Sequence, residues 1–256
     1  MIGLSAVYGP HLSRRLGLSL GVDLFPLMKI CSFNCVYCEC GSTQLKRYPT
    51  VDSSEVQVHC DEVLDEVREA LERVSKVDFV TISGCGEPTL HPEFHQVVEE
   101  LKILLMESFE AKLAVLTNSS TLTAAEVREA LKMVDLPVLK LDAGSEEFFK
   151  AVNMPHSGIS LGEIVDQLKK LCAENPKAVV QTMLLRYKGL SNASGRELEL
   201  LAERIAEVKP SGVQLYVPYR PPWSPSVTIP CSEELVGALK RIQEAVGEKV
   251  EVKLYL

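Results

Sequence analysis

Residues 31–38 read Cys31-Ser32-Phe33-Asn34-Cys35-Val36-Tyr37-Cys38 and place three thiols within eight residues at a C-x3-C-x2-C spacing. Thiolates bind soft metals and iron–sulfur clusters, and three of them close together can hold three corners of a cubane. A cubane has four irons, so one iron would have no protein ligand. An open metal position is where a metal site does chemistry. The stretch therefore predicts a reactive iron–sulfur centre.

Two other interpretations of these cysteines stay open. Cys40 follows at once, and with the three earlier cysteines it could complete a zinc site or form disulfides. Structural zinc sites usually combine two separated knuckles, and the sequence has no second one. Disulfides are typical of secreted chains, whereas no basic segment followed by an apolar one opens this sequence. The pattern favours the iron–sulfur interpretation.

The composition is that of a globular protein that needs no membrane. Its 256 residues suffice for one large α/β domain, and no apolar run is long enough to cross a bilayer. Eight cysteines in a chain without a secretion signal indicate metal or redox chemistry in the cytoplasm. The net charge of −8 gives no general attraction to polyanions. A nucleic-acid substrate would need a local basic patch, such as Arg14–Arg15 or Arg220.

Apolar segments alternate with helical patterns along the chain. The expected strands are residues 18–27, 77–82, 112–116, 137–141, 178–185 and 212–217. The expected helices are residues 55–75, 92–108, 123–134, 145–152, 161–172 and 196–208, followed by a last helix (233–246) and strand (250–255). This alternation predicts a parallel sheet with ligand sites at the carboxyl ends of its strands. An open doubly wound sheet is the structural alternative.

Polar and glycine-rich residues follow several of these strands. The turn Gly84-Cys85-Gly86-Glu87-Pro88 follows the second strand, and its glycines would let the backbone approach a ligand closely. Asn118 follows the third strand and could bind a hydroxyl group or a purine edge, or cap the next helix. Asp142 shares a face with Lys140, so it could bind ribose hydroxyls or form a salt bridge. Arg186, at the end of the fifth strand, suits a carboxylate.

The cysteine stretch and the glycine-rich turn together resemble the signature of the radical S-adenosylmethionine (radical SAM) superfamily. Its second motif is a Gly-Gly-Glu-Pro turn, which here carries Cys85 between the glycines. Its Thr-Asn-Gly type turn is matched by Thr117-Asn118, with Ser119 in place of glycine. The resemblance implies an α/β fold, a partial (β/α)6 TIM-type barrel of parallel strands. It implies one domain over residues 1–256, with a core barrel at about 18–218 and a carboxyl-terminal extension at 219–256.

The chain also resembles a compact group of iron–sulfur oxidoreductases related to the tRNA wyosine-forming enzymes. It shares the opening Val7-Tyr8-Gly9-Pro10, the segment Ser13-Arg14-Arg15-Leu16-Gly17 and the run from Cys31 to Gly41. The wyosine-forming enzymes carry further amino-terminal cysteines for a second cluster, but no cysteine precedes Cys31 here. One cluster is therefore expected.

The resemblance implies that a [4Fe–4S] cluster and S-adenosylmethionine (SAM) are the cofactors, with Cys31, Cys35 and Cys38 as metal ligands. An electron donor of ferredoxin or flavodoxin type would reduce the cluster. Cleavage of SAM would give methionine and a 5′-deoxyadenosyl radical that abstracts hydrogen from the substrate. The implied cofactor-binding residues are Gly84, Cys85, Gly86 and Glu87 at the methionyl end, Tyr37, Asn118 and Asp142 at the adenosine end, and Arg186 at the carboxylate.

The candidate catalytic residues are Cys40, Cys85 and Lys140. Both thiols lie in motif loops and could donate a hydrogen atom to a product radical or touch the substrate. The alternative is that they are small buried hydrophobes, as most cysteines outside such sites are. A zinc-binding interaction module and an electron-transfer protein are the alternatives to an enzyme. The substrate stays open between a small molecule, a peptide and an RNA base of the wyosine type, as does the oligomeric state.

Overall fold

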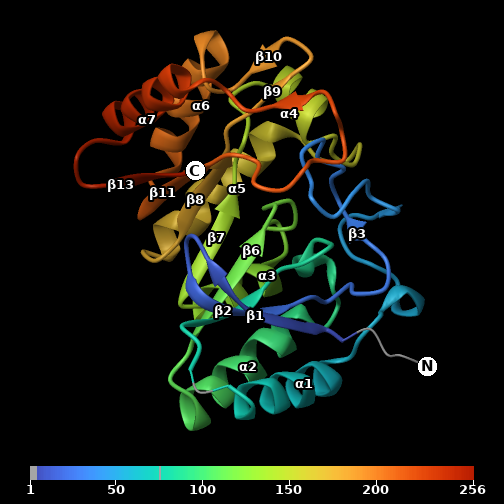
Figure 1. Cartoon of the computed structure of the whole chain (residues 1–256). Coiled ribbons are helices and arrows are strands. Elements are labelled where there is room, and N and C mark those ends of the chain that lie inside the picture. Colours follow the sequence, from blue (N-terminus) through green and yellow to red (C-terminus); the bar gives the residue numbers. More distant parts are fainter. Residues whose placement is uncertain (1–4, 75) are drawn as a thin grey trace. The chain divides into compact units, whose positions relative to one another are not determined.

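A computed structural model describes residues 5–74 and 76–256 (Figure 1). The chain forms two compact units, the first comprising the residues up to Ser32 with Thr43–Pro137, the second Phe33–Ser42 with Val138–Leu256. The chain therefore leaves the first unit after Ser32, returns to it at Thr43, and passes into the second unit after Pro137. One domain over residues 1–256 stays a prediction. Within the described ranges, no helix is both long and apolar enough to span a membrane.

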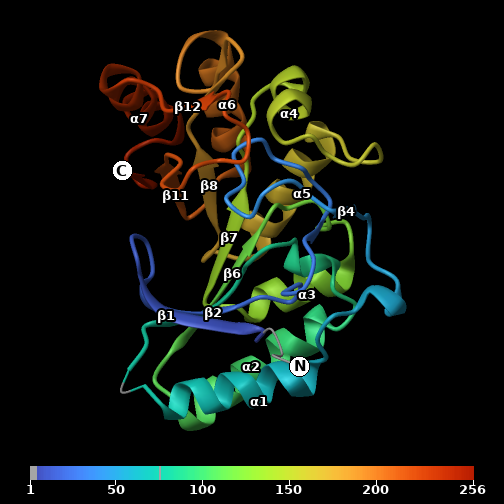
Figure 2. The same ribbon diagram turned by 45° about the vertical axis from the view of Figure 1, so that its right-hand side comes forward.

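The first unit is a layer of strands covered by helices. Its main strands, in spatial order, are β1 (Val7–Ser13), β2 (Gly17–Val22), β5 (Phe79–Ile82) and β6 (Lys112–Thr117). β1 is antiparallel to β2, whereas β2, β5 and β6 are parallel. Its helices are α1 (Cys60–Glu72), α2 (Phe94–Ser108) and α3 (Ala125–Met133). Both ribbon views show α1 and α2 side by side (Figures 1 and 2).

Three boundaries in this unit differ from the sequence prediction. β1 was not predicted because it is an exposed strand containing Pro10, so it lacks the apolar alternation that marks strands. The predicted strand 18–27 ends at Val22, because the Asp23 carboxylate then accepts the backbone N–H groups of Phe25 (2.9 Å) and Cys85 (2.8 Å). The predicted helix 55–75 begins only at Cys60, because a capping box starts it there.

The second unit repeats the strand–helix alternation. Its main strands, in spatial order, are β7 (Leu136–Lys140), β8 (Val179–Met183), β11 (Gly212–Tyr216) and β13 (Glu251–Tyr255). All of these neighbours are parallel. Its helices are α4 (Glu146–Val152), α5 (Leu161–Glu174), α6 (Gly195–Val208) and α7 (Ser232–Val246). A small antiparallel sheet consists of β10 (Leu190–Ser191), β9 (Arg186–Tyr187) and β12 (Val227–Thr228). The predicted helices and strands of this half are confirmed within a few residues.

Candidate functional site

The cysteine stretch is shared between the units, with Cys31 in the first and Cys35, Cys38 and Cys40 in the second. All four side chains are partly exposed and none is in a disulfide. Cys31 ends the short strand β3 (Ile30–Cys31), which pairs with β4 (Leu45–Lys46). Cys35 and Cys38 lie on a turn in which the N–H of Cys38 donates to the carbonyl of Cys35 at 3.1 Å.

The glycine-rich turn packs against Ile30, the residue before Cys31. The N–H of Glu87 donates to the carbonyl oxygen of Ile30 at 2.9 Å. A Cβ atom on Gly86 would lie 2.4 Å from that same oxygen, and one on Gly84, whose φ is +139°, would lie 2.2 Å from Asp23. Only glycine fits such close approaches. The glycine-rich turn therefore meets the start of the cysteine stretch in the first unit.

Glu87 is buried and acts as a cross-link. Its carboxylate accepts hydrogen bonds from the hydroxyl groups of Thr89 (2.5 Å) and Thr117 (2.6 Å) and from the backbone N–H of Asn118 (2.6 Å). Burial raises the pKa of Glu87 although these hydrogen bonds oppose it. The carboxylate thus ties the turn after β5 to the end of β6, while a contact of Glu87 with the methionyl group of SAM stays a prediction.

Asn118 lies beside Cys31 in the same unit. Its Nδ2 donates to Ser32 Oγ at 2.8 Å and to Cys31 Sγ at 3.5 Å, and its Oδ1 accepts the N–H of Ser120 at 3.0 Å. The alternative that it caps the next helix is wrong, because the N-cap of α3 is Ala124. Ser119 takes the left-handed conformation expected of the replaced glycine, with a φ of 68°.

A second buried network lies in the second unit around Asp142. Its Oδ1 accepts a hydrogen bond from the backbone N–H of Met183 at 2.7 Å and pairs with Lys140 Nζ at 2.9 Å, and its Oδ2 accepts a hydrogen bond from the hydroxyl group of Tyr37. Lys140 Nζ also donates to Tyr216 Oη at 2.5 Å and lies 5.1 Å from the Tyr37 ring centroid. The structure thus contains the Lys140–Asp142 salt bridge, and Asp142 as a ribose ligand stays a prediction.

Charge and burial set the protonation of this network. Burial lowers the pKa of Lys140, but the Asp142 carboxylate outweighs it and the net shift is upward. Burial and the nearby Asp142 raise the pKa of Tyr37 well above its usual value. Lys140 is therefore a cation and Tyr37 a neutral phenol at neutral pH. Lys140 is held as a structural counter-ion, and its catalytic role stays a prediction.

Cys35 joins this network through Asn153, the residue that follows α4. Asn153 Nδ2 lies 3.5 Å from Cys35 Sγ, 3.2 Å from Tyr37 Oη and 2.9 Å from Asp142 Oδ2. Burial, then Asp142 and Cys38, raise the pKa of Cys35 to about 11. A metal would have to displace that proton, as is usual for thiol ligands.

Within each unit, the surroundings of the cysteines suit ligands of an iron–sulfur cluster. Thiols are its usual ligands, and hydrogen bonds to the ligand sulfurs tune such clusters. Amide N–H groups of Asn118 and Asn153 are aimed at the sulfurs of Cys31 and Cys35. Within the described residues, no three His, Cys, Asp or Glu side chains converge as they would on a single metal ion. A cluster instead spreads its ligands over separate irons.

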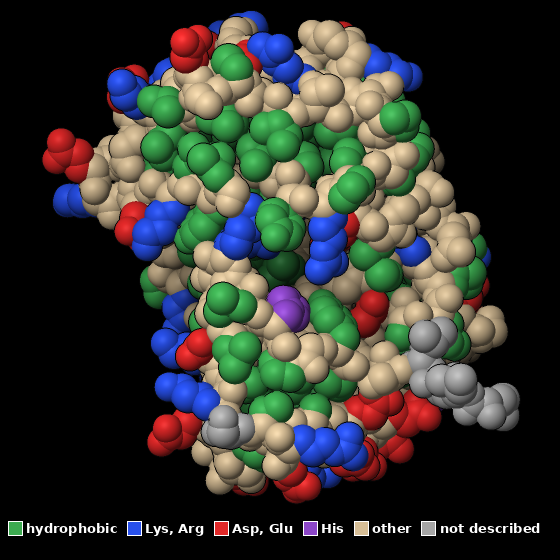
Figure 3. Space-filling model, in the orientation of Figure 1, with side chains coloured by type: hydrophobic (Ala, Val, Ile, Leu, Met, Phe, Trp, Pro, Cys, Tyr) green, Lys and Arg blue, Asp and Glu red, His purple; other side chains and the backbone are tan. Residues whose placement is uncertain are grey.

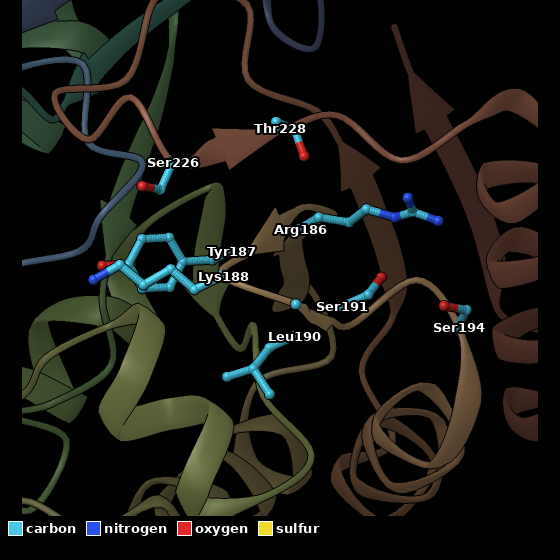
Figure 4. A pocket seen from close by; sticks show the side chains of 9 residues that line it. Arg186, Tyr187, Lys188, Leu190, Ser191, Ser194, Ser226 and Thr228 are labelled. Atoms are coloured by element: carbon cyan, nitrogen blue, oxygen red, sulfur yellow. The ribbon is translucent and has the colours of Figure 1, made fainter.

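The remaining candidates lie in other surroundings. Arg186 lies on β9 and pairs with Glu234 at 2.5 Å. It lines a pocket of about 520 Å³ together with Lys188 and the hydroxyl groups of Ser191 and Thr228 (Figure 4). No other candidate site residue lines that pocket. Cys85 donates its backbone N–H to Asp23, and roles for Cys40 and Cys85 in catalysis stay predictions.

Sequence reasoning missed two contacts to the cysteine loop. Asn153 is one, and Trp223 is the other, with its Nε1–H donating to the carbonyl of Cys35 at 2.8 Å. These residues are 118 and 188 positions away from Cys35. A single asparagine after a short helix carries no local signal of such a contact. The position of Asn153 beside Cys35 depends on the path of the chain after α4.

Comparison with known proteins identifies the family. A family model described as the radical SAM superfamily matches residues 25–191. The chain belongs to this superfamily. Radical SAM enzymes use a [4Fe–4S] cluster and SAM, so both predicted cofactors are confirmed at the level of the family. Membership also implies enzyme catalysis with a reductant and a substrate as partners.

Two relatives cover nearly all of this radical SAM chain. A protein named GTPase Obg from Brachyspira hyodysenteriae is 31% identical over 252 residues, which are 96% of this chain and 35% of that protein. A UPF0026 protein from Methanocaldococcus jannaschii is 30% identical over 255 residues, which are 98% of this chain and 75% of that protein. The chain thus spans 35% of the length of the first relative and 75% of the second.

Solved structures confirm the radical SAM fold. TYW1 with a lysine–pyruvate adduct bound matches with a TM-score of 0.61 at 18% identity, over 88% of this chain and 73% of that one. SuiB of Streptococcus suis bound to SAM matches with a TM-score of 0.59 at 15% identity, over 91% of this chain and 51% of that one. The predicted partial TIM-type barrel of mostly parallel strands is therefore confirmed.

Proposed function

We propose that this chain holds one [4Fe–4S] cluster through Cys31, Cys35 and Cys38 and cleaves SAM reductively. When bound, the reduced cluster and SAM supply methionine and a 5′-deoxyadenosyl radical, which abstracts a hydrogen atom from the substrate. The electron comes from a donor of ferredoxin or flavodoxin type. The work of the protein is to hold these groups in place and to keep water away.

The packing of the glycine-rich turn against Ile30 carries this proposal. Ile30 directly precedes Cys31, and its carbonyl oxygen accepts the N–H of Glu87 at 2.9 Å. A turn that places its backbone beside a cluster ligand can present carbonyl and N–H groups to a cofactor bound at the open iron. We therefore assign the backbone of Gly84, Cys85 and Gly86 to the methionyl end of SAM.

The Asp142 network supports the other end of the proposed site. Lys140 and Asp142 fix the hydroxyl group of Tyr37, which lies next to Cys38 in the chain. A ring held in this way can present its face to the adenosine of SAM and shield the cluster. Cys40 and Cys85 stay candidates for hydrogen-atom donation to a product radical. Replacing either with Ala and finding unchanged turnover would exclude it.

The experiment is anaerobic reconstitution with iron and sulfide, then reduction with dithionite in the presence of SAM and measurement of 5′-deoxyadenosine. We expect Cys35→Ala to lose both the cluster absorption and 5′-deoxyadenosine. Cys172→Ala is the matched control, because burial raises the pKa of this α5 thiol to about 12 and it has no assigned role. Zinc in place of iron would contradict the proposal, and a well-formed cluster without SAM cleavage would favour electron transfer.

The substrate is a separate question. In the upper part of Figure 3, hydrophobic side chains form a broad area on the face that is shown. The net charge of −8 gives no general attraction to a polyanionic substrate. An RNA base of the wyosine type therefore stays a prediction beside a small molecule or a peptide, and assays with each substrate class would separate them.

A further inference from the structure

Asn153 carries a buried polar atom that the protein itself leaves unmatched. The residue is 1% exposed, and its Nδ2 is within hydrogen-bond distance of Asp142, Tyr37 and Cys35. Its Oδ1 is buried and has no hydrogen-bond partner among the residues that the structure describes. Buried carbonyl groups are nearly always hydrogen-bonded, because an unpaired one loses its hydrogen bonds to water without gaining others. We therefore expect this oxygen to accept a hydrogen bond from a donor outside the described residues.

The direction of the amide is fixed by its neighbours. Exchanging Oδ1 and Nδ2 would turn the amide oxygen toward the Asp142 carboxylate, which has no proton to offer it. The NH2 group, in contrast, donates to Asp142 Oδ2 at 2.9 Å. The orientation is thus set by the hydrogen-bond network, as amide orientations should be. The unmatched atom is the carbonyl oxygen.

The partner of this oxygen must donate an N–H or O–H. Asn153 also contacts Cys35 Sγ at 3.5 Å, so its side chain lies against a proposed cluster ligand. In the proposed function SAM binds at the iron that the cysteines leave open, and SAM offers an amino group, ribose hydroxyls and the adenine amino group as donors. An anion or an apolar group could not satisfy a carbonyl oxygen.

We propose that Asn153 is a positioning residue that couples SAM to the cluster. Its NH2 group supports the sulfur of Cys35, and its Oδ1 accepts a hydrogen bond from an N–H or O–H of bound SAM. This inference rests on the proposed function and goes beyond it by assigning both roles to one residue outside the family motifs. Loss of the N–H···S contact disfavours the more negative, reduced cluster, so it lowers the reduction potential.

Asn118 is a matched control. Its Nδ2 also lies 3.5 Å from a cluster-ligand sulfur, that of Cys31, but its Oδ1 already accepts the N–H of Ser120. The two asparagines therefore share the contact to sulfur and differ in the unmatched oxygen. Replacement of either should shift the potential of the cluster. Replacement of Asn153 should in addition weaken SAM binding, because it removes the unmatched oxygen.

The test uses reconstituted wild type, Asn153→Ala, Asn153→Leu and Asn118→Ala, each checked for iron content and far-ultraviolet circular dichroism. Leu has the same number and branching of side-chain heavy atoms as Asn, so Asn153→Leu still tests the lost hydrogen bonds if the Ala variant does not fold. The measurements are the midpoint potential of the cluster by redox titration and the affinity for SAM by equilibrium binding. We expect both Asn153 variants to bind SAM about tenfold more weakly, as loss of one hydrogen bond would give. We expect all three variants to have a more negative midpoint potential.

SAM affinity unchanged in cluster-loaded Asn153→Ala and Asn153→Leu would overturn the inference, because a buried water would then satisfy Oδ1. A midpoint potential that shifts in Asn118→Ala but not in either Asn153 variant would overturn it too, because the Nδ2 of Asn153 would then not act on the sulfur of Cys35. A wild-type protein that forms no cluster contradicts the proposed function and this inference with it. A wild type that loads the cluster and binds SAM while its Asn153 variants match it contradicts the inference alone.

Discussion

Glu87 in the first unit and Asp142 in the second are buried carboxylates near the ends of strands, and their charges are stabilised in different ways. Among the described residues, the groups that donate to Glu87 are the hydroxyl groups of Thr89 and Thr117 and two backbone N–H groups, all of them neutral. Asp142 instead pairs with the cation of Lys140. Neutral donors stabilise a buried charge only in part, whereas a counter-ion balances it.

The two carboxylates therefore have different structural roles. Glu87 holds together three segments of the first unit, and burial raises its pKa because no cation compensates. Asp142 and Lys140 form a balanced pair that fixes Tyr37 and Tyr216. The first network is a mechanical support of the glycine-rich turn. In the second network the charges of Asp142 and Lys140 cancel, and the pair holds the two tyrosine hydroxyl groups in fixed positions.

The largest expected effect comes from breaking the balanced pair. Lys140→Met leaves the Asp142 carboxylate buried without its counter-ion, and we expect a loss of about 3–5 kcal/mol in the free energy of unfolding. Tyr216→Phe is the control, because it removes only one hydrogen-bond acceptor of Lys140 and should cost about 1 kcal/mol. Denaturant unfolding measures both. A Lys140→Met cost no larger than that of Tyr216→Phe would show that the pair is not a balanced one.

Glu87→Gln should have the next largest effect. The new NH2 group would face the backbone N–H of either Thr89 or Asn118, neither of which can turn away, so we expect a loss of about 1–3 kcal/mol. Because the folded-state pKa of Glu87 is raised, its contribution to stability is greatest below its usual pKa and declines as the pH rises through the raised value.

That decline gives the Glu87→Gln prediction a pH signature. Glutamine does not titrate, so the stability difference between wild type and variant should shrink as the pH rises from acid toward neutral. Unfolding curves at a series of pH values measure it. A difference that grows with pH would mean that Glu87 is stabilised as a carboxylate, like Asp142, and the comparison between the two networks would fail.

Gly86→Ala tests whether the Glu87 network needs its close approach to Ile30. The added methyl group would lie 2.4 Å from the Ile30 oxygen, so the backbone must shift and the expected cost is about 1–3 kcal/mol. Gly237→Ala, in the middle of α7 with open space around it, should instead stabilise by about 0.5–1 kcal/mol. Melting curves and iron content after reconstitution measure both. Full iron loading in Gly86→Ala would show that the turn does not support Cys31.

The sequence predicted the regular elements well where one face is apolar. Strands such as β8 and helices such as α6 are confirmed within a few residues, because burial repeats with the period of the element. β1 escaped prediction because it is exposed, and β2 was overextended because the Asp23 turn has no apolar signal. A pattern of apolar residues cannot reveal an exposed strand such as β1, or a turn such as that at Asp23, which is stabilised by side-chain hydrogen bonds.

The candidate site was predictable only where residues lie close in sequence. The spacing of Cys31, Cys35 and Cys38 and the Gly84–Pro88 turn were visible because each motif is local. That Gly86 contacts Ile30 and that Asn153 contacts Cys35 depend on how distant segments pack. The same packing gives Arg186 a partner, Glu234, that no sequence pattern indicated. Distant pairing is decided by tertiary structure.

We expect the smallest effect for the pair Arg186–Glu234. It is a carboxylate–cation pair like Asp142–Lys140, but its guanidinium is in contact with water. A hydrogen bond from Arg186 lowers the pKa of Glu234 to about 2. Because this folded-state pKa lies below the usual carboxyl value, the pair stabilises the protein above about pH 4.5 and loses that contribution as the pH falls toward 2. Glu234→Gln should therefore lose less stability than wild type between pH 7 and pH 3, by a small margin because the guanidinium is half exposed. Denaturation midpoints at the two pH values measure this difference. An acid sensitivity equal to that of wild type would mean that water screens the exposed pair completely, and that a carboxylate–cation pair contributes in this protein only where, as at Asp142, it is buried.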